Sequence, residues 1–165
     1  MARMFSRARA QPWRLFAYLV MFVGASALIN AWIFIGDGES WAQSLTNPAW
    51  SPPGYVIAVV WTLLFGTMAA ASYLIDQDNE PRFVIAARLG VILWWVACMI
   101  WPVLYFQVQE VANGFYTTVQ AITVGFIVLP VVYQASPRAA LTLLPLQIWL
   151  CFALFLAWRT WQLNA

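Results

Sequence analysis

Residues 47–62 read NPAWSPPGYVIAVVWT, a proline-rich stretch that runs directly into an apolar segment. Its prolines, among them Pro52 and Pro53, have no amide hydrogen and a fixed φ, so the stretch is stiff, extended and unable to continue a helix. Trp50 and Tyr55 each carry one polar atom on a large ring, which is typical of side chains at the boundary between apolar and aqueous surroundings. The stretch therefore predicts a rigid loop at a membrane surface, followed by a membrane helix.

Composition places the whole chain among integral membrane proteins. Of its 165 residues, 64% are hydrophobic, 17% are aromatic and only 8% are charged, and the mean hydropathy is +0.76. These values exceed what a soluble domain of this size carries. A helix needs about 20 mainly apolar residues to cross the hydrocarbon core. We predict an all-α bundle in a single membrane domain, with five helices at about 13–36, 55–75, 83–106, 112–133 and 138–162.

A secretory signal peptide is the competing interpretation of residues 13–36. Arginines precede an apolar run, and Ala25-Ser26-Ala27 could serve as a cleavage site. The apolar character continues through Ile35, however, which is too long for an ordinary signal core. We therefore expect a retained membrane helix.

The arginines predict how the chain is oriented, because lysine and histidine are absent. By the positive-inside rule, the arginines before the first helix, those that flank the second loop and the one in the fourth loop face the cytoplasm: Arg3, Arg7, Arg9, Arg14, Arg82, Arg88 and Arg138. Residues 37–54 and the turn near Glu110 contain no basic residue and fall on the opposite side. Arg159 is the exception, and its long side chain can snorkel to the interface. The net charge of +2 thus reflects membrane topology and offers no case for nucleic-acid binding.

The titratable residues argue against an enzyme. Cys98 and Cys151 fall inside predicted helices, and without histidine a zinc or haem site ligated through that residue is excluded. Axial haem ligation by cysteine or tyrosine stays open. Acidic residues fall in loops or at helix ends, with no nucleophile and adjacent base in sight: Asp37, Glu39, Asp76, Asp78, Glu80 and Glu110. This placement also argues against a proton-coupled transporter. We predict no catalytic residues, no metal and no required cofactor.

Small residues recur at a spacing of four in the predicted helices, which puts each pair on one helix face. Packing within the bundle accounts for most such pairs. A homodimer or a contact with a partner protein could use one of the others, and the first helix, with Ala27 and Ala31, and the third, with Gly90, are the preferred candidates.

Three segments resemble the tryptophan-rich sensory protein family, also called the translocator protein or peripheral benzodiazepine receptor family. WAQSLTNPAWSPPGY at 41–55, followed by Trp61 and Thr62, is similar to the loop after the family's first membrane helix. WPVLYF at 101–106 resembles the family's WSxxFF, and PLQIWLCFALFLAWRTWQLN at 145–164 resembles PYLxWxxFAxxLNxxIxxLN. The resemblance implies five packed membrane helices, commonly as a homodimer in bacteria. We expect a bacterial inner membrane, and the arginines predict a cytoplasmic N-terminus.

The resemblance also implies a pocket beneath residues 37–54, which would act as its lid. Family members take porphyrins, sterols and synthetic aromatic ligands there, so a porphyrin or other tetrapyrrole, or a lipid, is the expected occupant. The residues that we expect to bind it are Trp41, Trp50, Pro52, Pro53, Tyr55, Trp61, Cys98, Trp101, Leu146, Trp149, Ala153 and Ala157.

Several departures from the family pattern remove polar groups from this expected pocket. Cys98 and Ala157 stand where the family has asparagine, Leu146 stands where it has tyrosine, and Asn47 replaces a lysine before the loop proline. The remaining polar candidates nearby are Asn47, Ser51 and Gln147. Recognition of a porphyrin carboxylate is weakened, and the family's proposed cholesterol motif is missing, with Trp158 where a tyrosine would stand.

Three functions of different classes follow. The first is a membrane ligand-binding or sensory protein that stacks a flat aromatic or tetrapyrrole ligand on its rings. The second is a non-catalytic structural or assembly subunit of a larger membrane complex, for which light-harvesting or reaction-centre polypeptides of a photosynthetic complex are the expected partners. The third, an enzyme that degrades porphyrin, is the weakest for want of a general base. An open cavity favours the first function, and a cavity filled by Trp94, Phe152 or Phe155 favours the second.

Overall fold

The computed structural model describes residues 11–33, 35, 38–78 and 81–165. This part of the chain is built from helices and contains no strand: α1 (Pro12–Leu19), the π-helical turn η1 (Val20–Gly24), α2 (Ala25–Ile33), α3 (Gly38–Ser44), α4 (Gly54–Asp78), α5 (Pro81–Val108), α6 (Val111–Ala135) and α7 (Pro137–Asn164). Five spans are long and apolar enough to cross a membrane, with α1, η1 and α2 together forming the first, Pro12–Ile33. The all-α membrane fold class is confirmed.

The spans are close to those expected, with differences at their ends. α4, α5, α6 and α7 each begin one or two residues earlier and end about two or three residues later than predicted. The end of the expected first helix, at residues 34 and 36, lies outside the described residues. Residues 37–54 were expected to form a loop throughout, which is wrong in part because α3 lies within this stretch. The organisation as a single membrane domain stays a prediction.

Local chemistry explains where several helices begin. Ser136 ends α6 and caps α7, since its Oγ accepts a hydrogen bond from the Ala139 amide at 3.1 Å. Pro137, the first residue of α7, has no amide to satisfy there. Between α5 and α6 the chain turns at Gln109, whose φ of 56° is the left-handed conformation that ends a helix. These short turns keep α5, α6 and α7 antiparallel neighbours.

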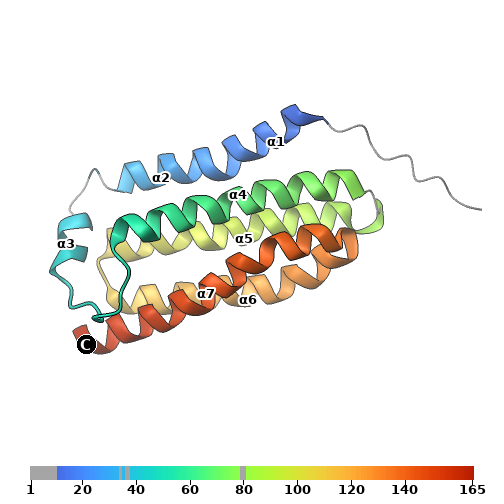
Figure 1. The fold of residues 1–165 in the computed structure, drawn as a ribbon. Coiled ribbons are helices and arrows are strands. Elements are labelled where there is room, and N and C mark those ends of the chain that lie inside the picture. The colour runs from blue at the N-terminus through green and yellow to red at the C-terminus, as the bar shows by residue number, and fades with distance from the viewer. Residues whose placement is uncertain (1–10, 34, 36–37, 79–80) are drawn as a thin grey trace, which may run out of the picture.

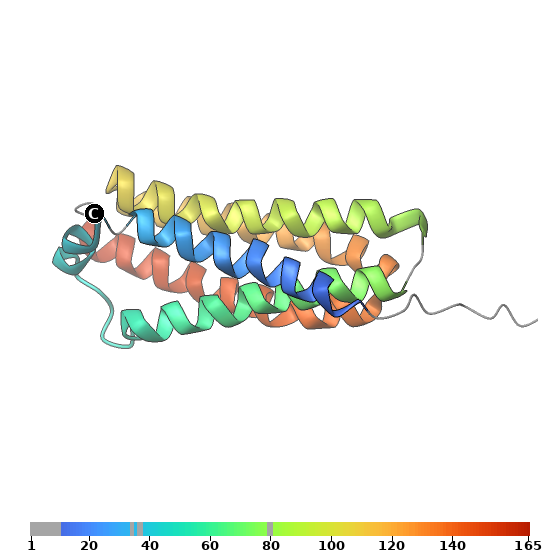
Figure 2. The ribbon, with the colours of Figure 1, turned by 90° about the horizontal axis from the view of Figure 1, so that it is seen from above.

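The helices lie nearly side by side in an elongated bundle (Figure 1). α5 packs along α6, α6 packs along α7, and α7 packs along α4, whereas α4 and α5 contact each other much less. Viewed from above, the first span crosses over the space between α4 and α5, with α1 beside α4 and α2 beside α5 (Figure 2). α3 and the C-terminal end of α7 lie together at one end of the bundle (Figure 1). That end is where the connection between α3 and α4 passes over the helices.

The centre of the bundle holds a large side chain opposite a glycine. Trp94 of α5 is fully buried, and Gln147 of α7 is buried beside it. Gly125 of α6 makes room for both, because a Cβ atom at this position would lie 2.0 Å from Gln147 Oε1 and 2.4 Å from the Trp94 ring. Trp94 thus fills the core and leaves the space nearer the lid open.

Gly90, a residue that we considered for a dimer contact, is used inside the bundle. A Cβ atom at Gly90 would lie 3.2 Å from Val128 of α6. The small residue therefore brings α5 and α6 close together within one chain. Ala27 lines a cavity described below, but Ala27 and Ala31 are both exposed. A homodimer stays a prediction, for which Gly90 does not supply a free face.

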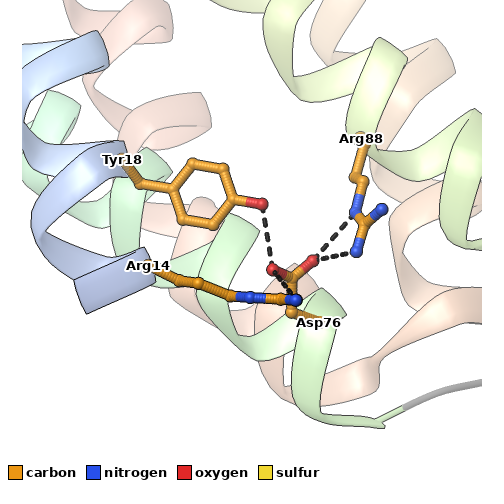
Figure 3. Close-up of polar contacts among 4 residues, drawn as sticks. All are labelled: Arg14, Tyr18, Asp76 and Arg88. Carbon is orange, nitrogen blue, oxygen red and sulfur yellow. Dashed lines mark hydrogen bonds and ion pairs between the residues drawn. The ribbon is translucent and has the colours of Figure 1, made fainter. Parts of the chain in front are cut away.

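A buried carboxylate joins three helices at the end of the bundle away from α3 (Figure 3). The side chain of Asp76, in the last turn of α4, is only 5% exposed. Its Oδ2 accepts hydrogen bonds from Arg14 at 3.2 Å and from the Tyr18 hydroxyl at 3.0 Å. Its Oδ1 accepts from Arg88 Nε at 2.8 Å and also from Arg88 Nη2. The sequence placed Asp76 at a helix end but gave no sign of its burial.

Candidate functional site

A cavity of about 730 Å³ opens beneath the connection between α3 and α4. Its walls come from α2, α4, α5, α6 and α7, and the connection itself covers it. Sites for drug-sized ligands measure roughly 300–1,000 Å³, so the volume suits a molecule of several fused or linked rings. Phe152 lines the cavity without filling it, whereas Trp94 and Phe155 are not among the lining residues.

Aromatic rings form much of the wall. On α5, Trp101 stacks on Tyr105 with ring centroids 4.7 Å apart and planes at 18°. On α7, Trp149 contacts Phe152 at 5.1 Å, and on α4, Trp61 stacks on Phe65 at 5.4 Å. Alanines lie between these rings and leave the open space: Ala27, Ala58, Ala121, Ala153 and Ala157. The rings therefore present flat apolar faces on several sides of the cavity.

The lid, which we define as residues 38–53, is fastened to α7 at one end of the cavity. Asn164 Oδ1 accepts a hydrogen bond from the Thr46 amide at 2.9 Å, and Asn164 Nδ2 donates to the Thr46 carbonyl at 2.9 Å. Nearby, the Trp50 ring stacks on Phe155 of α7 with centroids 5.2 Å apart and planes at 13°. The lid is thus held by a two-point amide contact and a ring stack.

The same lid is fastened to α5 at its other end. Trp41 of α3 packs edge-on against Tyr105, with ring centroids 5.0 Å apart. Gly38 lies so close to α5 that a Cβ atom there would be 3.0 Å from the Phe106 carbonyl oxygen. The lid therefore bridges α5 and α7 over the cavity mouth.

Most polar atoms in the wall are already used within the protein. Several lining side chains donate to backbone carbonyls: Ser26 to Phe22, Asn30 to Ser26, Thr62 to Ala58, Thr118 to Gly114, and Trp101 to Gly114. Among the described residues, three buried side-chain atoms have no hydrogen-bond partner: Trp94 Nε1, Gln147 Oε1 and Trp149 Nε1. Of these three residues only Trp149 lines the cavity.

The structure brings eight of the twelve candidate residues to the cavity wall. These are Pro52, Tyr55, Trp61, Cys98, Trp101, Trp149, Ala153 and Ala157. Trp41, Trp50, Pro53 and Leu146 do not line it. Trp41 and Trp50 instead fasten the lid to α5 and α7. Leu146 is fully buried in the core, two turns further from the lid than Ala153.

Several lining residues were missed by the sequence analysis. Asn30, Thr117 and Thr118 contribute polar atoms, and Tyr105 extends the ring stack of Trp101. Thr117 and Thr118 lie on α6, for which no segment was matched to the family pattern, so nothing in the sequence singled them out. Tyr105 could have been found from WPVLYF, since it follows Trp101 by four residues and therefore shares its helix face.

Comparison with known sequences settles the family. The sequence model of the TspO/MBR family matches residues 12–162. The chain belongs to the TspO/MBR family. It is 28% identical to the translocator protein of Ovis aries over 163 residues, covering 94% of this chain and 93% of the relative. It is 30% identical over 137 residues to the tryptophan-rich protein TspO of Chlorobaculum tepidum, with 79% and 84% covered, and 26% identical over 153 residues to protein CrtK of Rhodobacter capsulatus, with 89% and 92% covered.

As a TspO/MBR protein the chain is a multi-pass membrane protein, and its departures from the family pattern can be placed in the cavity. Cys98 and Ala157 form part of the wall, and Asn47 and Ser51 lie at its lid. Gln147 does not reach the cavity, because it packs beside Gly125 in the core. Among the described residues no group of three or more histidine, cysteine, aspartate or glutamate side chains could hold a metal ion.

Proposed function

We propose that this TspO/MBR protein binds a flat aromatic or tetrapyrrole ligand in the cavity beneath its lid. The observation that carries the proposal is the open volume of about 730 Å³ between pairs of rings in contact on α4, α5 and α7. Ring stacking on Trp61, Trp101 and Trp149 supplies most of the affinity, and few polar groups fix the orientation. A lipid is the other occupant that such a site accepts. The protein acts by binding, without catalysis and without a required cofactor.

A binding titration with a cavity-filling variant tests this proposal. Ala153→Phe places a ring in the open space, whereas Ile148→Phe puts the same ring on the same helix at a side chain that is 70% exposed toward the membrane. Quenching of tryptophan fluorescence by a porphyrin in lipid nanodiscs should saturate for the parent protein and for Ile148→Phe. It should become linear and unsaturable for Ala153→Phe. Equal saturation in all three proteins would mean that the porphyrin binds elsewhere.

A second candidate is a non-catalytic assembly subunit of a larger membrane complex. An exposed row of rings on the outside of the lid and α7 favours it: Trp50, Phe155 and Trp158 are 44%, 50% and 38% exposed, and Arg159 lies over the Trp158 ring at 5.8 Å. Such a face suits apolar helices of light-harvesting or reaction-centre polypeptides, or a second copy of the chain.

Purification of the native protein in a mild detergent separates the two candidates. A tetrapyrrole released from an otherwise solitary protein, identified by its absorption spectrum and mass, supports ligand binding. Stoichiometric co-migration with pigment-binding polypeptides supports the assembly subunit. A bacterial inner membrane is the proposed location. The positions of the arginines favour a cytoplasmic N-terminus, and protease protection in oriented vesicles tests that orientation.

A further inference from the structure

The cavity wall carries no charged side chain among the described residues that line it. Arg159 is adjacent in sequence to the lining residue Thr160, yet its guanidinium donates to Gln162 Oε1 at 2.6 Å and lies over the Trp158 ring. Arg14 and Arg88 are bound to Asp76, which lies about 30 Å along α4 from the lid. The positions of these arginines therefore leave an anion in the cavity without a cationic partner.

Several polar side chains of the wall already donate their hydrogens within the protein. Ser26, Thr62 and Thr118 donate their hydroxyl hydrogens to backbone carbonyls, and Ser26 Oγ also accepts a hydrogen bond from Trp95 Nε1 at 2.9 Å. The Trp101 indole N–H likewise donates to the Gly114 carbonyl at 3.1 Å. An ionised carboxylate only accepts hydrogen bonds, so these groups have no hydrogen left to offer it. A buried charge without a partner carries a large desolvation penalty.

From these observations we propose that the cavity selects uncharged ligands, so that among tetrapyrroles it takes an esterified form and rejects the free dicarboxylate. This inference rests on the proposed function and adds the charge class of the ligand. A porphyrin ester keeps the flat ring system on which the aromatic side chains of the wall stack. Its carbonyl is a neutral acceptor that one neutral donor satisfies. The Trp149 indole N–H, which has no acceptor in the protein, is a donor of that kind in the wall. Selectivity arises because the desolvation of the charged diacid in this cavity costs free energy that the ester does not lose.

The test compares a porphyrin dicarboxylic acid with its dimethyl ester in nanodiscs of uncharged lipid. Ala153→Phe supplies the background for each porphyrin, which removes simple partition into the bilayer from the comparison. We expect the ester to bind the parent protein at least tenfold more tightly than the diacid. Equal affinities, or tighter binding of the diacid, would overturn the charge selectivity while leaving ligand binding intact. Failure of both porphyrins to bind above the Ala153→Phe background would instead overturn the proposed function.

A substitution at the lid tests the cause of the selectivity. Asn47 lines the cavity from the exposed lid, so Asn47→Lys adds a cation at the mouth without disturbing the core. Asn47→Gln is the matched control, with a longer side chain and no charge. We expect Asn47→Lys to raise the affinity for the diacid, relative to the affinity for the ester, about tenfold above the same ratio in Asn47→Gln. An unchanged diacid affinity in Asn47→Lys would refute charge as the cause.

Discussion

Arg14 and Arg88 bind opposite oxygens of one buried carboxylate, that of Asp76 (Figure 3). The arginines come from α1 and α5, so the carboxylate of α4 joins three helices at one point. Elsewhere α4 and α5 contact each other little, and α1 with α2 lies across the space between them. This cluster is therefore the main polar connection that holds the first span against the rest of the bundle within the described residues.

Asp76→Asn should destabilise the protein. The substitution leaves two arginines without their counter-charge, and breaking a buried ion pair costs about 3–5 kcal/mol. Because each arginine side chain stays 40% exposed, we expect a smaller loss, about 2 kcal/mol. The free energy of unfolding in mixed micelles measures it. Glu110→Gln is the matched control, since Glu110 is exposed and makes no cap hydrogen bond, and an equal loss in both variants would contradict the expectation.

The two arginines should contribute unequally. Arg88 donates twice to Oδ1, whereas Arg14 donates once to Oδ2, where the Tyr18 hydroxyl also donates. Removal of Arg14 leaves that oxygen with the tyrosine, while removal of Arg88 leaves its oxygen without a described donor. Arg88→Gln should therefore lower the stability by about 1 kcal/mol more than Arg14→Gln. Unfolding of the two variants under the same micelle conditions decides this, and the reverse order would show that Tyr18 does not compensate.

Asn164→Ala should loosen the lid without unfolding the bundle. The substitution removes two hydrogen bonds to Thr46 and one, at 2.7 Å, to the Thr160 carbonyl. At about 1 kcal/mol for each lost bond to the lid, a bound ligand should dissociate at least tenfold faster. Stopped-flow release of the porphyrin ester measures this rate. Gln162→Ala, which removes only the contact with Arg159, should leave the rate unchanged, and a matching acceleration there would point to a general effect at the end of α7.

Two glycines in the bundle, Gly125 on α6 and Gly66 on α4, should respond in opposite ways to substitution by alanine. A Cβ atom at Gly125 would collide with Gln147 and Trp94, so Gly125→Ala should destabilise by about 3 kcal/mol. No atom lies within 4 Å of a Cβ atom at Gly66, so Gly66→Ala should be neutral or stabilise by a fraction of the roughly 1 kcal/mol that alanine gains in a helix. Melting temperatures of the two variants check the pair. A harmless Gly125→Ala would mean that Trp94 can move into the cavity.

The sequence predicted the membrane helices well because apolar length is a local property. The resemblance to the family identified the positions of Trp61, Cys98 and Trp101, and all three line the cavity. Trp41 and Trp50 were expected to line the cavity because they coincide with tryptophans of the family pattern. Their actual partners, Tyr105 and Phe155, lie far away along the chain, and only the folded bundle shows which rings meet.

The sequence also could not predict how far along a helix a residue lies from the cavity, or which charged side chain is buried. Leu146 shares a helix face with Ala153, but about 10 Å of helical rise carries it below the cavity. Asp76 begins a polar run that continues through Asp78 to Glu80 and reads as a solvated loop. Its burial depends on arginines supplied by two other helices. A pattern within one segment does not contain that information.

The lid joins α5 to α7, and this has a mechanical consequence. The lid contacts Tyr105 of α5 on one side and Asn164 of α7 on the other, so its conformation depends on the distance between these two helices. A bulky ligand that pushed α5 and α7 apart, or a neighbouring protein that pressed them together, would change the conformation of the lid between Trp41 and Trp50. We therefore expect a change in the cavity to be detectable at exposed lid residues such as Trp50, which is 44% exposed.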